Sequence, residues 1–99
     1  MIDVTPQEFA IVRDILRRIV PDREVMVFGS RSKGTAKPFS DLDLAIMGAQ
    51  PVSLSVCAEL AHEFDESPLP FKVDLVDWAS SSASFRQAIA SQLVPLEMP

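Results

Sequence analysis

The stretch Gly29–Asp43 constrains this 99-residue chain more than any other part of it. It begins with a Gly-Ser pair, continues through ten further residues, and ends with Asp41 and Asp43, which a single leucine separates. The apolar residues on either side are typical of strands, so the stretch predicts a turn that joins two strands. Successive side chains of a strand point to opposite faces, and we therefore expect both carboxylates on the same face.

Asp41 and Asp43 form a candidate metal site because of this spacing. Two like charges held close together repel each other, and a bound divalent cation relieves the repulsion. Carboxylate ligands with open positions suit Mg²⁺ or Mn²⁺, which retain waters and bind substrate phosphates. Taken alone, the pair also fits a turn and the start of a strand, because Asp is common in turns. The upstream Gly-Ser pair and a third carboxylate downstream favour the metal site.

The third carboxylate comes from residues 71–77, which we predict to be a strand. Its apolar residues alternate, which places Asp74 on the face opposite the core, as for Asp41 and Asp43. Asp77 has the opposite parity and lies at the strand end, so we prefer Asp74. Three carboxylates on one uncovered face are able to hold two metal ions about 3.5–4 Å apart. One ion would activate an attacking hydroxyl group, and the other would carry a triphosphate.

Four residues of the turn are candidate phosphate ligands. Gly29 has no Cβ and lets the backbone approach a phosphate closely, while Ser30 adds a hydroxyl donor. If residues 30–34 form a helical turn, its N-terminal amides also face the anion. Arg31 and Lys33 add positive charge, although their long side chains are equally suited to point into solvent.

The composition predicts one globular domain over residues 1–99, with 47% hydrophobic and 23% charged residues. No apolar run approaches the roughly 18 residues that a membrane span needs. The lack of a secretion signal and the lone Cys57 predict a cytoplasmic protein. The net charge of −5 argues against nucleic acid as a partner, because domains that bind it are usually basic. A small polyphosphate suits the basic Gly29–Asp43 stretch better.

Hydrophobic periodicity and breaker residues divide the chain into three helices and three strands. We expect helices over residues 6–20, 54–66 and 82–93, and strands over residues 24–28, 41–47 and 71–77. This order predicts an α/β (α+β) fold, in which a small mixed sheet carries helices packed on one face.

The Gly-Ser pair, the Asp-x-Asp pair and the third Asp on a later strand resemble the DNA polymerase β-type nucleotidyltransferase superfamily. Within it, GSRSKG and SDLDLAI are similar to the minimal nucleotidyltransferases (MNT proteins) of prokaryotes, and the similarity extends from the first helix to FKVDLVDW. The resemblance implies a palm-like nucleotidyltransferase fold. It also implies that Gly29 and Ser30 contact phosphate and that Asp41, Asp43 and Asp74 ligate metal.

The resemblance also implies a substrate and a partner. MNT proteins are commonly paired with a helical HEPN-family protein, often as antitoxin and toxin, and some transfer AMP from ATP to a tyrosine of that toxin. We therefore expect a metal-dependent nucleotidyltransferase in a hetero-oligomer with such a toxin. The chain leaves no room for the helical domain with which larger superfamily members grip substrate, so we expect a partner to complete the site.

Two alternatives remain open. In the first, the chain is a non-catalytic antitoxin that neutralises its partner by occlusion, and nucleotide binding is vestigial or regulatory. In the second, the enzyme class is the same but the acceptor is a small molecule or an RNA end.

Overall fold

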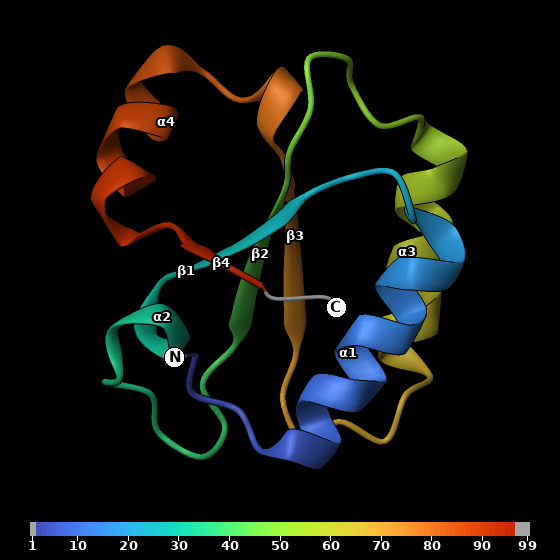
Figure 1. Ribbon diagram of the computed structural model, residues 1–99, viewed down its shortest axis with the longest axis vertical. Helices are drawn as coiled ribbons and strands as arrows, with labels where there is room; N and C mark the ends of the chain where they lie inside the picture. Colours follow the sequence, from blue (N-terminus) through green and yellow to red (C-terminus); the bar gives the residue numbers. More distant parts are fainter. Residues whose placement is uncertain (1, 97–99) are drawn as a thin grey trace.

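Four strands form one mixed sheet, and helices lie against both of its faces (Figure 1). The computed structural model describes residues 2–96. In chain order the elements are helix α1 (Pro6–Ile19), strand β1 (Val25–Phe28), helix α2 (Ser30–Lys33), strand β2 (Leu42–Ile46), helix α3 (Leu54–Asp65), strand β3 (Val73–Asp77), the 3₁₀ turn η1 (Trp78–Ser80), helix α4 (Ala83–Ile89), the 3₁₀ turn η2 (Ala90–Gln92) and strand β4 (Val94–Pro95).

The sheet has the strand order β3-β2-β1-β4. Strand β1 runs antiparallel to β2 and to β4, whereas β2 and β3 are parallel and are connected through α3. The predicted α/β class with a mixed sheet is therefore confirmed. Strand β4 was not predicted, because it is only two residues long and shows no periodicity.

Helices α1 and α3 cover the first face of the sheet and enclose the main core. Helix α1 begins with the capping box that its sequence predicts, in which Thr5 and Glu8 exchange hydrogen bonds of 2.9 and 3.1 Å. The buried members of this core are Val12, Ile15, Leu16, Val20, Val25, Val27, Leu42, Leu44, Ile46, Val52, Leu60, Phe64, Phe71 and Leu96. The alternating leucines of β2 thus point to the first face, which leaves Asp43 on the second.

The second face carries a smaller apolar cluster beside the carboxylates. Phe28, Ala45 and Ile89 are buried there, and the Phe85 ring meets the Phe28 ring edge-on at 6.2 Å. The expectation that helices pack on one face only was therefore wrong in this respect, since α4 covers part of the second face. The physical reason lies in the uninterrupted apolar run of β1, because a strand that is apolar on both sides needs cover on both.

The predicted boundaries differ from the observed ones most strongly near the C-terminal end. Residues 82–93 were expected to form one helix, but α4 ends at Ile89 and the chain continues through η2 into β4. This change of direction brings Gln92 next to the turn that follows β1. No helix within residues 2–96 is long and apolar enough to cross a membrane.

Candidate active site

The parallel pairing of β2 with β3 brings the predicted carboxylates together. Its register places Asp43 directly opposite Asp74. Asp41 precedes the first residue of β2 and has the same parity as Asp43, so all three side chains belong to the second face of the sheet. Asp77, at the end of β3, accepts hydrogen bonds from Val52 N at 3.1 Å and Ser80 Oγ at 2.7 Å, and therefore orders the loops there.

The three carboxylates interact electrostatically. Burial raises the pKa of Asp43, and the negative charges of Asp74 and Asp41 raise this pKa further. Each of these causes disfavours the ionised form of Asp43. The site therefore holds more negative charge than its own surroundings neutralise, which is the condition that a bound cation relieves.

The donor set fits a hard divalent cation, because it consists of carboxylate oxygens alone. As the side chains lie, no three Asp, Glu, His or Cys residues within residues 2–96 are close enough together to hold an ion. Asp41 is exposed and the Asp74 side chain is 43% exposed, so both have room to turn toward one. The Asp74 carboxylate meets Lys72 Nζ at 3.7 Å, an exposed contact of the kind that is weak in water.

Gly29 places the backbone of the turn against the carboxylates. Its φ of 77° lies in the region that favours glycine, and a Cβ at this position would collide with Asp43 Oδ2. The expected helical turn follows as α2, and the Gly29 carbonyl oxygen accepts hydrogen bonds from Ser32 N at 3.1 Å and Ser32 Oγ at 3.0 Å. Helix α2 thus begins at the residue that follows the close contact between Gly29 and Asp43.

Gln92 contacts the same turn from a distant part of the chain. The Gly29 N–H group donates to Gln92 Oε1 at 3.0 Å, across 63 residues of sequence. Gln92 was not predicted as a site residue, because its sequence position indicated the end of a regular helix. Only the pairing of β1 with β4, in which Val27 lies opposite Val94, carries Gln92 to Gly29.

Arg31 corrects one of the predicted phosphate contacts. Its side chain is buried, with 5% of the residue exposed. The guanidinium group stacks on the Phe71 ring at 4.0 Å and donates hydrogen bonds of 2.7 to 3.5 Å to the carbonyl oxygens of Asp3, Lys37, Pro38 and Ser40. These partners occupy the donors that a phosphate would need, so Arg31 holds the loop before Asp41. Lys33 is exposed at the end of α2, and its phosphate contact stays a prediction.

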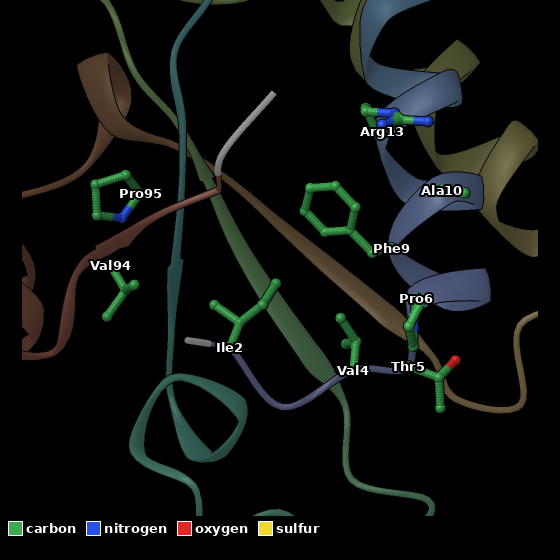
Figure 2. A pocket seen from close by; sticks show the side chains of 9 residues that line it. All are labelled: Ile2, Val4, Thr5, Pro6, Phe9, Ala10, Arg13, Val94 and Pro95. Carbon is green, nitrogen blue, oxygen red and sulfur yellow. The ribbon is translucent and has the colours of Figure 1, made fainter. Parts of the chain in front are cut away.

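A hollow of about 610 Å³ lies away from the carboxylates, between α1 and β4. Figure 2 shows the side chains of Ile2, Val4 and Phe9 directed into it, with Val94 and Pro95 on the opposite side. Val94 pairs with Val27, whose side chain belongs to the main core, so this hollow opens on the first face of the sheet. It is separate from the carboxylate site.

The mixed sheet, the three carboxylates and the glycine turn together define a nucleotidyltransferase domain. The chain belongs to the polymerase beta nucleotidyltransferase family, which it matches over residues 13–96. It is 46% identical over 96 residues to the probable protein adenylyltransferase MntA of Haemophilus influenzae, covering 97% of this chain and 84% of that protein. It is 35% identical over 79 residues to the protein adenylyltransferase MntA of Shewanella oneidensis, covering 79% of this chain and 56% of that protein.

Solved structures show the same relationship. A toxin–antitoxin crystal structure with AMP-PNP superposes with a TM-score of 0.74 at 32% identity, covering 92% of this chain and 73% of that one. A complex of a tri-AMPylated HEPN toxin from Shewanella oneidensis with an MNT antitoxin superposes with a TM-score of 0.68 at 28% identity, covering 94% of this chain and 71% of that one. The expected polymerase β-type fold and the MNT resemblance are therefore confirmed.

Proposed function

We propose that this chain transfers AMP from ATP to a hydroxyl group of a protein partner, a tyrosine of a HEPN-type toxin, and thereby acts as an antitoxin. The observation that carries the proposal is the register that sets Asp43 opposite Asp74 with Asp41 on the same face, beside the Gly29 turn. The MntA relatives are named protein adenylyltransferases, and solved relatives include an MNT antitoxin in complex with an AMPylated HEPN toxin.

Each part of the site has a distinct task in this reaction. Asp41, Asp43 and Asp74 would hold Mg²⁺ or Mn²⁺, two ions when the nucleotide is present, and such ions neutralise the triphosphate and make a hydroxyl group more acidic. The Ser30 hydroxyl group and the first amides of α2 would hold the phosphates that leave as pyrophosphate. Gly29 lets these phosphates approach the backbone. Asp74 would accept the proton that the attacking hydroxyl group loses as its oxygen bonds to the α-phosphorus.

An exposed aromatic side chain supports a protein as the acceptor. Phe39, two residues before Asp41 in the sequence, has 78% of its surface exposed. A large exposed aromatic residue is suited to contact with a partner that brings its hydroxyl group to the carboxylates. The free Cys57 and the absence of a membrane-spanning helix within residues 2–96 support a cytoplasmic location for this exchange.

The test is transfer of label from ATP to the partner. The chain and its HEPN-type partner are incubated with Mg²⁺ and ATP labelled at the α-phosphate, and label on the partner is measured by gel and mass spectrometry. We expect labelling that Asp43→Asn abolishes and that a control in α3, Asp65→Asn, leaves unchanged, because Asp65 is exposed at the end of α3, which packs on the first face of the sheet.

Toxin neutralisation in cells separates chemistry from occlusion. If the Asp43→Asn chain still binds its partner but no longer neutralises it, transfer is the working mechanism. If neutralisation persists without labelling, the chain acts by occlusion and the proposal is wrong.

A further inference from the structure

Gln92 lies where the nucleotide would meet the turn, although it comes from the opposite end of the chain. Its Oε1 is 3.0 Å from Gly29 N, and Gly29 in turn packs against the Asp43 carboxylate. The residue after Gly29 is Ser30, which begins α2. Gln92 therefore shares its immediate surroundings with the residues that would hold the phosphates.

The contact with Gly29 fixes the orientation of the Gln92 amide group. A backbone N–H group is a donor, so the atom that it meets must be the carbonyl oxygen of the side chain, and the two N–H donors on Nε2 point elsewhere. Within residues 2–96, Nε2 donates no hydrogen bond, and this atom is not fully buried. Nε2 therefore faces solvent beside the turn.

We propose that Gln92 is a nucleotide-binding residue, which steadies Gly29 through Oε1 and donates from Nε2 to an oxygen of the bound polyphosphate. An uncharged donor suits the position of Gln92. A lysine or arginine side chain there would also be attracted to the neighbouring carboxylates, whereas a neutral amide group is free to approach a phosphate. The proposal rests on the proposed function, since it assigns one further contact of the same site.

The substitution Gln92→Glu separates the two halves of this role. Glutamate still accepts a hydrogen bond from Gly29 N, but it replaces the two donors by a negative charge. Gln87→Glu is the matched control, because Gln87 is exposed on α4 and its substitution adds the same negative charge five residues earlier in the chain. Binding of AMP-PNP in the presence of Mg²⁺ is measured by calorimetry, and thermal unfolding is measured without nucleotide.

We expect Gln92→Glu to raise the dissociation constant for AMP-PNP at least tenfold, with a melting temperature close to that of the unsubstituted chain, whereas Gln87→Glu changes binding less than twofold. With the partner present, the KM for ATP should rise more than kcat falls. Unchanged binding by Gln92→Glu would overturn the role of Gln92 alone. If the unsubstituted chain itself binds no AMP-PNP, the proposed function fails together with this inference.

Discussion

The substitution Arg31→Met tests whether this residue orders the fold or binds the substrate. Methionine keeps an unbranched apolar side chain over the Phe71 ring but removes the guanidinium group and all of its donors. A phosphate ligand would lose affinity and leave the stability of the chain unchanged. A residue that holds a loop would destabilise the chain even when no nucleotide is present.

The contacts of Arg31 allow the loss of stability to be estimated. Hydrogen bonds from charged groups contribute roughly 1.5–3 kcal/mol each, and a desolvated cation–π contact contributes about 2 kcal/mol. Four carbonyl oxygens share three nitrogens, and the loop relaxes once it is released, so these values do not add. We expect Arg31→Met to lower the free energy of unfolding by about 3–4 kcal/mol. That is a large part of the roughly 5–15 kcal/mol typical of a domain.

Urea unfolding, followed by the fluorescence of Trp78, measures this loss. Arg17→Met is the matched control, because Arg17 is exposed in the last turn of α1, where a substitution changes stability by less than about 0.5 kcal/mol. Arg31→Lys should recover only part of the loss, since an ammonium group cannot donate in several fixed directions at once. A cost below about 1 kcal/mol for Arg31→Met, combined with loss of AMP-PNP binding, would refute the loop-holding role.

Three further predictions test the electrostatics and geometry of the site. Burial and the neighbouring carboxylates raise the folded-state pKa of Asp43, so ionisation of Asp43 destabilises the fold as the pH rises through that pKa. In metal-free buffer near neutral pH, the Asp43→Asn chain should therefore be more stable than the unsubstituted chain by up to about 1 kcal/mol. Thermal melts at several pH values should show this difference disappearing in acid. Lys72→Ala should change the free energy of unfolding by less than about 0.5 kcal/mol, because the Lys72–Asp74 pair is exposed, and a larger loss in urea would contradict this. Gly29→Ala should lower the free energy of unfolding by well over the roughly 1–2 kcal/mol of a left-handed backbone, because the new Cβ also meets Asp43. Gly34→Ala has open space around it and should lower this free energy by about 1–2 kcal/mol alone. Equal urea midpoints for the two variants would refute the packing contact with Asp43.

The carboxylate face was predictable because it depends on local alternation. In the β2 sequence the leucines and aspartates alternate one by one, and the side chains of a strand follow the same period. The same reasoning identified Asp74 rather than Asp77 on β3, and the observed register sets Asp74 opposite Asp43. Neither step needed knowledge of distant contacts, which is why the sequence was sufficient.

Two of the contacts that the sequence did not predict join segments that are far apart. Arg31 donates to the carbonyl oxygen of Asp3, 28 residues away, and Gly29 meets Gln92 across 63 residues. A backbone carbonyl oxygen is present at every residue, so no pattern of residue types marks the one that an arginine will reach. Strand β4 was not predicted for the same reason, because its two residues form a strand only through their pairing with β1.

Within residues 2–96, three arginines donate hydrogen bonds to carbonyl oxygens of loops, so these donors are engaged before any substrate binds. Arg23 donates to carbonyl oxygens of the loop after β2, Arg31 to those of the loop before it, and Arg86 to those of Trp78 and Ala79 after β3. They account for three of the nine basic residues in the sequence. In the proposed reaction the donors of Arg31 are already engaged, so the charge of a bound triphosphate would be met by the cation, the first amides of α2, Lys33 and neutral donors such as Gln92. Affinity for the nucleotide should therefore depend far more on the divalent cation than on any single basic side chain.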